Sequence, residues 1–280
     1  MKIILGDNQF FGINHYDLKK GIKNKNKFNS VDSINDFIND SLGLGLDGFM
    51  INSNQLGYKL ISDYNFDSFK EIHYTIPYPH KFAAIVNESG FMSLLNYAYK
   101  NSSFLDNIKS GLKLLKSKNL IHLTSLGINL EVPKSFEKGN YIYLQNIITD
   151  LLIGIKRYDI IIEFIIAVSK LGYKPGLITI NPCLLNKILM DNLANKYFKD
   201  LIICMNINKE GFKVFPSLKQ VEKLISSNLK YKIMGMSIFS SGGSQINESI
   251  NYIKSLNLDY IVFGSSNLTN IENNYNLLKN

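Results

Sequence analysis

Residues 260–274 read YIVFGSSNLTNIENN, and this stretch decides the fold together with the units that precede it. Four residues suited to a buried strand lead into Gly264, two serines and an asparagine, and a polar segment with helical spacing follows. A strand, a short turn and a helix form one repeating unit of an α/β protein. The number of such units in the chain therefore determines which α/β fold it adopts.

Similar units recur along the whole chain. We expect strands within residues 2–12, 47–54, 71–79, 141–147, 175–181, 200–208, 231–239 and 260–266. Helices are expected between them, over 30–46, 81–127, 157–173, 182–193, 216–229 and 244–258. Strands that alternate with helices indicate a parallel sheet covered on both faces. Eight such units in 280 residues predict a (β/α)8 barrel, with a doubly wound open sheet as the alternative.

The chain has no linker rich in glycine, serine and proline, so we expect a single domain over residues 1–280. Extra length follows the third strand, and residues 81–140 are expected to form a helical insertion within the barrel. The sequence leaves the role of this insertion open between a lid, a dimer surface and a plain helical excursion. A homodimer is therefore one of the states left open.

The composition is that of a soluble globular protein, with 45% hydrophobic residues and a mean hydropathy of −0.02. No apolar run approaches the ~18 residues that a spanning helix needs, and the start of the chain is too polar for a signal peptide. We therefore expect a cytoplasmic protein without a membrane partner. Cys183 and Cys204 are the only cysteines, which argues against a disulfide framework or a thiolate metal site.

The net charge of +8 suggests nucleic acid as a partner, but the kind of basic residue argues against it. Of 31 basic residues only Arg157 is an arginine, and the lysines are scattered rather than clustered. Proteins that read bases depend on arginine, because its planar guanidinium matches guanine edges and phosphates. A small anionic ligand fits this charge better than a nucleic acid does.

Polar residues recur where the predicted strands end, while the strand interiors are nearly free of them. In a barrel these ends and the loops after them form the active site. The amides expected there could bind substrate hydroxyls, and they are Asn8, Asn52, Asn54, Gln145, Asn146, Asn181, Asn206 and Asn208. The alternative for some polar residues is a helix cap, above all for Asn181, which precedes Pro182, and for Ser266 or Asn267.

The loops after the seventh and eighth strands read SIFSSGGS (237–244) and FGSSN (263–267). Glycines let the backbone approach a ligand, and amide and hydroxyl donors at a helix N-terminus favour an anion. Barrels commonly hold a phosphate at this pair of loops. We therefore expect a phosphate site formed by Ser240, Ser241, Gly242, Gly243, Gly264, Ser265 and Ser266.

Five residues are candidates for acid, base, nucleophile or oxyanion stabiliser: Asp7, His15, His80, Lys81 and Lys209. His15 with Asp7 could form a carboxylate–imidazole pair for proton transfer. His80 and Lys81 follow two prolines, and Lys209 follows the sixth strand, where an amine could form a Schiff base or bind an anion. No HExxH, CxxC or clustered His/Asp spacing predicts a metal site.

Several motifs resemble the aldo/keto reductase superfamily: LGLGLDGFMINSNQLG, SIFSSGG and FGSSNLTNIENNYNLL. The resemblance implies a (β/α)8 barrel whose last two loops hold the phosphate end of NADPH. GDNQFFGINH, PYPHK, LQNIITDLL, NINKEGF and FGSS are more similar to a prokaryotic barrel family related to those reductases, without an assigned activity. That second resemblance spans nearly the full chain.

The catalytic residues of the reductases are missing. Those enzymes carry an aspartate at the end of the second strand and a tyrosine four residues later, followed by glycine. Aligned on Gly57, these positions hold Asn52 and Leu56, and leucine cannot donate a proton to a carbonyl. Tyr78 and His80 are the available substitutes. The resemblance thus implies an inherited fold and phosphate site with changed chemistry.

These observations lead to three functional hypotheses. The first is an isomerase or lyase that performs proton-transfer chemistry on a sugar phosphate or a nucleotide-sugar precursor, without an obligatory cofactor. The second is an oxidoreductase that uses NADP(H) and a displaced catalytic residue. The third is a sensor without catalytic activity, built on a degenerate barrel.

Overall fold

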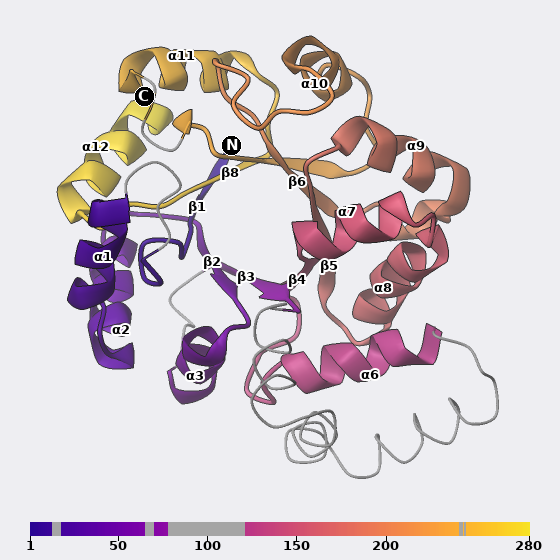
Figure 1. Cartoon of the computed structure of the whole chain (residues 1–280), viewed down its shortest axis with the longest axis horizontal. Helices are drawn as coiled ribbons and strands as arrows, with labels where there is room; N and C mark the ends of the chain where they lie inside the picture. Colours follow the sequence, from indigo (N-terminus) through magenta and orange to yellow (C-terminus); the bar gives the residue numbers. More distant parts are fainter. Residues whose placement is uncertain (13–17, 65–69, 78–120, 241–242, 244) are drawn as a thin grey trace.

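The computed structural model describes residues 1–12, 18–64, 70–77, 121–240, 243 and 245–280 of the chain. Within these residues, eight parallel strands pair in sequence order and β8 closes onto β1 (Figure 1). The predicted (β/α)8 barrel is therefore confirmed, and the open doubly wound sheet is wrong.

Each strand lies inside the stretch predicted for it or within one residue of it. The strands are β1 (Lys2–Leu5), β2 (Gly48–Asn52), β3 (Glu71–Ile76), β4 (Tyr141–Leu144), β5 (Lys174–Thr179), β6 (Ile202–Asn206), β7 (Lys232–Met236) and β8 (Tyr260–Phe263). The predicted stretches ran beyond the carboxyl ends because they included polar loop residues. Those loops lie at the carboxyl end of the barrel, here called the mouth; the opposite end is the foot.

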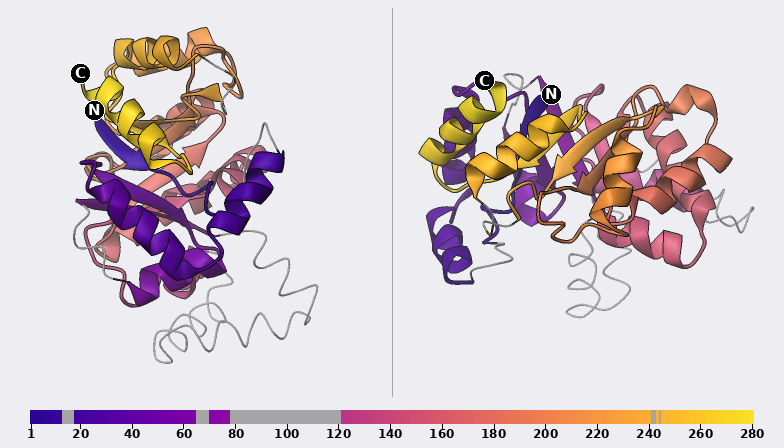
Figure 2. Two further views of the ribbon diagram at one scale, coloured as in Figure 1. Left: turned by 90° about the vertical axis from the view of Figure 1, so that its left-hand side faces the viewer. Right: turned by 90° about the horizontal axis from the view of Figure 1, so that it is seen from above.

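Helices surround the barrel, and most of them lie where they were predicted (Figure 2). These are α2 (Val31–Leu42), α6 (Ile121–Glu131), α8 (Tyr158–Lys170), α9 (Pro182–Asn192), α10 (Leu218–Ile225), α11 (Ile246–Ser255) and α12 (Leu268–Lys279). Figure 2 also shows that the two termini lie close together. No described helix is both long and apolar enough to cross a membrane.

Three helices were not anticipated: α1 (Leu18–Lys27), α3 (Gln55–Asp63) and α7 (Asn146–Gly154), besides the short 3-10 turn η1 (Asn195–Tyr197). The stretch predicted for the fourth strand ran to Ile147, whereas the strand ends at Leu144 and α7 begins at Asn146. Two consecutive isoleucines after Asn146 suit a strand as well as a helix, which explains the error.

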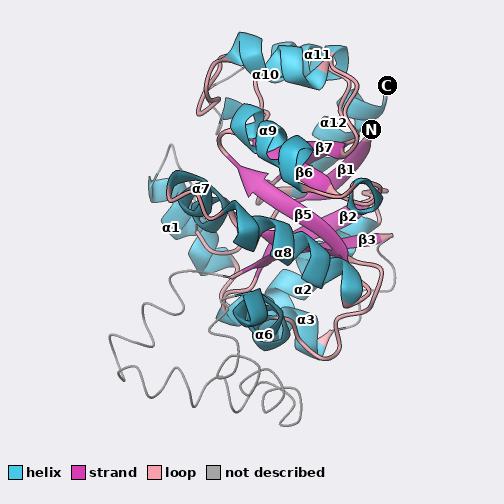
Figure 3. Ribbon diagram, turned by 90° about the vertical axis from the view of Figure 1, so that its right-hand side faces the viewer, coloured by secondary structure: helices cyan, strands magenta, loops and turns pink. Residues whose placement is uncertain are grey.

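Part of the predicted insertion at 81–140 is described. Its α6 connects β3 to β4 and packs against α8 (Figure 3), so this helix belongs to the third unit of the barrel itself. Residues 78–120 lie outside the described residues.

The apolar side chains form two clusters, one between strands and helices and one inside the barrel. Strand alternation explains the division, because successive side chains point to opposite faces of the sheet. The inner cluster contains Tyr141 and Tyr143 of β4 with Tyr260 of β8, together with smaller residues. Gly176 makes room for Tyr143, since a Cβ there would lie 2.3 Å from the tyrosine ring. The barrel interior is therefore a packed core, and a ligand is limited to its ends.

Helix caps fix several of the loops around the mouth. Asn181 accepts a hydrogen bond from the Leu184 N–H at the start of α9, and Asn267 accepts one from the Thr269 N–H in α12. Both caps were predicted. Ser30 forms a capping box with Ser33 at the start of α2.

Candidate functional site at the mouth of the barrel

The strongest candidate site is a hydrogen-bonded group at the mouth formed by Asp7, Asn52, Thr75 and Gln145. The Asp7 carboxylate accepts a hydrogen bond from the Asn52 backbone N–H (2.7 Å) and two from the Asn52 side-chain amide (2.8 and 3.0 Å). The amide oxygen of Asn52 in turn accepts a hydrogen bond from Thr75 Oγ1 (2.6 Å) and one from Gln145 Nε2. The ends of β1, β2, β3 and β4 thus converge on one cluster.

The barrel fold brings these residues together in a simple way. Asn52 and Thr75 are paired in the register of β2 and β3, and Gln145 directly follows β4. Gly57 lets α3 approach the end of β2, because a Cβ at this position would lie 2.0 Å from the Asn52 carbonyl oxygen. Both the backbone N–H and the side-chain amide of Asn52 are therefore fixed in position.

Asp7 differs from an ordinary surface carboxylate. It is 5% exposed, and it forms no ion pair with any residue in the described part of the chain. Burial raises the pKa of Asp7 to about 6, and the hydrogen bonds from Asn52 offset only part of that increase. A carboxyl group with this pKa exchanges a proton readily near neutral pH.

Two other predicted amides of the mouth are engaged in holding loops. Asn206 accepts a hydrogen bond from Ser237 Oγ (2.7 Å) and donates one to the Lys213 carbonyl oxygen (3.0 Å). Asn208 bonds both the N–H and the carbonyl oxygen of Phe212. These contacts leave little of either amide for a ligand, so both residues act chiefly on the loop after β6.

The remaining predicted amides fall into two groups. Asn54 and Asn181 are helix caps, which occupies their side-chain oxygens. Asn8 is exposed in the loop after β1, and Asn146 is half-buried at the first position of α7. Of the eight amides predicted to bind substrate, Asn52 and Gln145 are the ones that the structure brings into the Asp7 cluster.

The turn after β8 retains the features expected of an anion site. Gly264 is exposed, Ser265 and Ser266 are half-buried, and α12 begins two residues after Ser266. Lys27, the last residue of α1, donates a hydrogen bond from Nζ to the Ser266 carbonyl oxygen. An ammonium group therefore lies beside this turn, and nothing in the spacing of the chain predicted it.

Gln9 covers the inner side of the same turn. Its side chain donates to the Gly6 carbonyl oxygen, and its own oxygen lies where a Cβ on Gly264 would clash, at 2.1 Å. A side chain at position 264 would therefore have to displace the end of the Gln9 side chain.

The loop after β7 is a weaker candidate for phosphate. Ser240 is buried and donates a hydrogen bond to a carboxylate oxygen of Glu210 (2.6 Å). A carboxylate at this place repels a phosphate. Gly243 is exposed, while Ser241 and Gly242 lie outside the described residues.

Among the described residues, Lys209 makes no contact with the Asp7 cluster. Its amine forms an ion pair with Glu248 of α11 at 2.5 Å, and about half of its side chain is exposed (48%). The hydrogen bond to Glu248 raises the pKa of Lys209, which opposes the neutral amine that a Schiff base needs. His15, His80 and Lys81, the other predicted catalytic residues, lie outside the described residues.

Thr75 and Asp150 are polar residues of the mouth that were not among the candidates for catalysis or substrate binding. Thr75 lies on the same interior-facing alternation of β3 as His73, and this alternation was the available signal. Asp150 of α7 accepts hydrogen bonds from Thr179 Oγ1 and the Ile180 N–H, which ties α7 to the end of β5. Burial raises the pKa of Asp150 as well.

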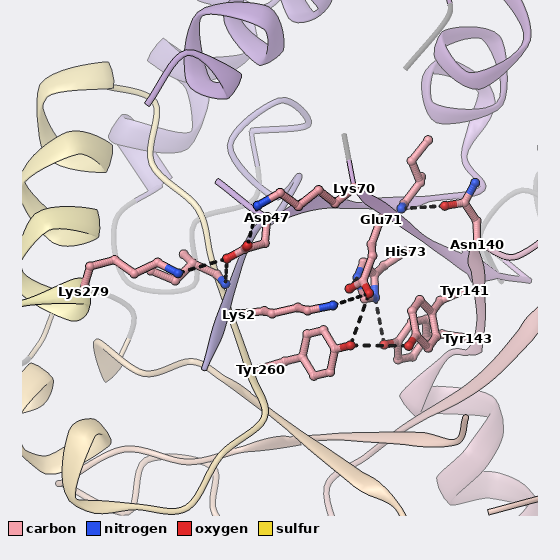
Figure 4. Close-up of polar contacts among 12 residues, drawn as sticks. Lys2, Asp47, Lys70, Glu71, His73, Asn140, Tyr141, Tyr143, Tyr260 and Lys279 are labelled. Carbon is pink, nitrogen blue, oxygen red and sulfur yellow. Dashed lines mark hydrogen bonds and ion pairs between the residues drawn. The ribbon is translucent and has the colours of Figure 1, made fainter. Parts of the chain in front are cut away.

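A second polar cluster lies at the foot of the barrel (Figure 4). His73 is fully buried and stacks on Tyr141, with ring centroids 4.7 Å apart. Its Nδ1 lies 2.9 Å from the Tyr143 hydroxyl, and its Nε2 faces Glu71 at 3.6 Å. Glu71 also accepts a hydrogen bond from Lys2 (2.5 Å). The apolar cluster inside the barrel, which contains Tyr141, Tyr143 and Tyr260, packs around these polar groups.

Among the described residues, no group of three or more histidines, cysteines, aspartates and glutamates is arranged to hold a metal ion. No protein-family model matches the chain, and comparison with curated proteins finds no match either.

Proposed function

We propose that the protein is an enzyme that transfers a proton on a phosphorylated small molecule, with Asp7 as the general acid and base. Sugar phosphates and nucleotide-sugar precursors are the substrate class, and isomerisation or carbon–carbon lysis is the reaction class. The single observation that carries this proposal is the environment of Asp7. It is a buried carboxyl group at the mouth of a barrel, with a pKa of about 6.

The polarity of the mouth supports a sugar-like substrate. The Asp7 cluster contains one acid, two amides and one hydroxyl, and no lysine or arginine is bonded to it among the described residues. Such a cluster suits a neutral, hydroxylated reacting group better than an anionic one. A phosphate would then lie at the rim of the mouth.

The turn after β8 is the best place for that phosphate. The N-terminus of α12 supplies a positive dipole, and Lys27 supplies a positive charge at Ser266. Each charge-assisted hydrogen bond of this kind contributes about 1.5–3 kcal/mol. The loop after β7 contributes less to this proposal, because Glu210 occupies the Ser240 hydroxyl.

The experiment is a proton-exchange assay that works whatever product the enzyme forms. A panel of sugar phosphates is incubated with the protein in D2O, and loss of carbon-bound protons is followed by NMR. We expect exchange with at least one member, and we expect Asp7→Asn to slow it by about 10²–10⁴-fold, the usual contribution of a general base. Exchange that persists unchanged in Asp7→Asn would contradict the role of Asp7.

The reductase hypothesis predicts a different result in a parallel assay with NADPH. Leu56, at the position of the reductase tyrosine, is 36% exposed and has no acidic proton, and Asn52 is bonded to Asp7. The substitutes considered for that tyrosine, Tyr78 and His80, lie outside the described residues. Oxidation of NADPH that depends on the protein, without proton exchange on sugar phosphates, would favour the reductase over the proton-transfer enzyme.

A further inference from the structure

The amides of Asn52 and Gln145 form a chain between Asp7 and the interior of the mouth. Asn52 donates to Asp7 through Nδ2 and accepts through Oδ1, where Gln145 Nε2 and Thr75 Oγ1 both donate. Side-chain amide orientations follow from the surrounding donors and acceptors. Here the ionised carboxylate fixes both amides, because it accepts and cannot donate.

This orientation determines which atom of the Gln145 amide can bond a ligand. Its Nε2 is directed at Asn52, so its carbonyl oxygen is the end that does not bond Asn52. Gln145 follows Tyr141 and Tyr143 on the inward-facing alternation of β4, and it is 9% exposed. With Asp7 ionised, Gln145 therefore offers a hydrogen-bond acceptor to a ligand in the mouth.

Protonation of Asp7 reverses the direction of the hydrogen bond between Asp7 and the Asn52 side chain. Oδ2 accepts from the Asn52 backbone N–H, which cannot rotate away, so the proton settles on Oδ1. The new O–H must donate, and the side chain bonded to Asp7 in this cluster is the Asn52 amide. A half-turn of that amide presents its oxygen to Asp7 and its NH2 group to Thr75 and Gln145.

Thr75 already has the second partner that this reversal needs. Its hydroxyl donates to Asn52 Oδ1 at 2.6 Å and lies 3.4 Å from the Ile51 carbonyl oxygen. When Asn52 turns its NH2 group toward it, the Thr75 oxygen can accept and its hydrogen can go to Ile51. Gln145 makes the same half-turn, so its oxygen accepts from Asn52 and its NH2 group becomes the free end.

We propose that Asn52 and Gln145 are a reversible hydrogen-bond relay that turns the free end of Gln145 from acceptor to donor when Asp7 takes up a proton. Asn52 is a positioning residue in this relay, and Gln145 is the residue that contacts the ligand. The inference rests on the proposed function of Asp7 and specifies the group on which it acts.

The relay matches an α-hydroxycarbonyl compound, the reacting unit of an open-chain sugar phosphate. Its hydroxyl group donates to the Gln145 oxygen while Asp7 is ionised. Asp7 then removes the proton from the carbon that bears this hydroxyl. The electron pair of that C–H bond forms the carbon–carbon double bond, and the π pair of the carbonyl group moves onto its oxygen, which gives the enediolate. The former carbonyl oxygen, on the carbon next to that hydroxyl, carries the negative charge, and the Gln145 NH2 group donates to it as the proton arrives on Asp7.

The test is an NMR titration of the intact protein without ligand. The side-chain amide signals of Gln145 and the carboxyl carbon of Asp7 are followed together from about pH 4 to pH 8, a range that brackets the expected midpoint. We expect one common midpoint for both residues. The side-chain amide of Asn54, a helix cap near the same strand end, serves as the internal control and should not move.

Two variants decide between a relay and a passive contact. Asp7→Asn carries an NH2 group where the protonated oxygen would be, so it should hold Gln145 in its acid-state position at every pH. Gln145→Met removes the last member and should leave the titration of the Asn52 amide in place.

The relay is wrong if Asp7 titrates while Gln145 stays fixed, and that result leaves the role of Asp7 intact. It is also wrong if the Gln145 signals still titrate in Asp7→Asn. If that variant does not fold, the wild-type titration decides alone. The proposed function has its own test, since it fails when Asp7→Asn keeps full proton exchange.

Discussion

Asp7 at the mouth and Glu71 at the foot are both buried carboxyl groups, but their surroundings shift their pKa values in opposite directions. At the mouth, Asp7 bonds the uncharged Asn52, and burial raises its pKa to about 6. At the foot, burial also favours the neutral form of Glu71, but the neighbouring His73 and Lys2 at 2.5 Å lower its pKa below the ordinary value (Figure 4). The difference is the nearby cation. It holds Glu71 in its ionised form, whereas Asp7, without one among the described residues, is free to exchange its proton.

This difference between Asp7 and Glu71 agrees with a general property of (β/α)8 barrels. Residues at the carboxyl ends of the strands serve chemistry, whereas those at the amino ends serve stability. At the foot, tyrosine hydroxyls and a stacked histidine fill the space around Glu71. If this comparison is correct, substitutions at the foot change the free energy of unfolding, and substitutions at the mouth change its pH dependence and the activity.

The largest effect on stability is expected for His73→Phe. The phenyl ring keeps the stacking on Tyr141 but leaves the Tyr143 hydroxyl buried without its nitrogen partner and removes a neighbour of the Glu71 charge. We expect a loss of about 3–5 kcal/mol in the free energy of unfolding at pH 7, measured by urea denaturation. Asp7→Asn is the matched variant at the mouth and should not be destabilised at this pH. Equal losses in both variants would remove the distinction between the two ends.

The second effect concerns the pH dependence of stability that comes from Asp7. Its pKa is higher in the folded protein than the ordinary value of 3.8, so the folded state binds the proton more tightly. Wild type should therefore lose stability relative to Asp7→Asn as the pH rises from about 4 to about 7. The change in the difference is about 2 kcal/mol over that range, and unfolding curves at several pH values would measure it.

The third effect, from Glu71, has the opposite sign. Its pKa is lower in the folded protein than the ordinary value of 4.5, so its stabilising contribution is present above that pH and is lost as the pH falls below it. Glu71→Gln should cost about 1–2 kcal/mol at pH 7 and progressively less in acid. Lys2→Met offers a control, because it removes the same ion pair from the other side. A pH-independent difference would contradict the assignment of charge to Glu71.

The smallest effect is expected for the exposed ion pair of Lys209 and Glu248. Lys209→Ala should change the free energy of unfolding by less than about 1 kcal/mol, since solvent screens such pairs. It should also leave the proton-exchange rate on sugar phosphates within about twofold of wild type. A loss of exchange comparable to that of Asp7→Asn would return Lys209 to the catalytic site and would weaken the case for Asp7.

The sequence predicted the barrel well because each strand is a short apolar run that ends in polar residues. It also placed Asp7, Asn52 and Gln145 among the candidates individually. Their contact could not be predicted, because it depends on the register between β1 and β2, where Ile4 pairs with Gly48 and Leu5 with Phe49. Spacing along the chain contains no information on that register.

The sequence also could not distinguish amides that bind a ligand from amides that hold a loop. Asn206 and Asn208 lie at the end of β6 much as Gln145 lies at the end of β4, yet they bond Ser237, Lys213 and Phe212. Such local hydrogen bonds are a common use of asparagine. The contact between Glu71 and His73 at the foot is easier to infer from the sequence. The two residues are two positions apart on one strand, so their side chains must point to the same face of the sheet.

The most direct test of proton transfer at the mouth is the pKa of Asp7, measured in the ligand-free protein by the pH titration of its carboxyl carbon signal. We predict a midpoint of about 6, because the carboxyl group is buried beside an amide and without a bonded cation among the described residues. A midpoint near the ordinary value of 3.8 would show that Asp7 is a fixed carboxylate like Glu71, and the proton-transfer role proposed for the mouth would then have no carrier.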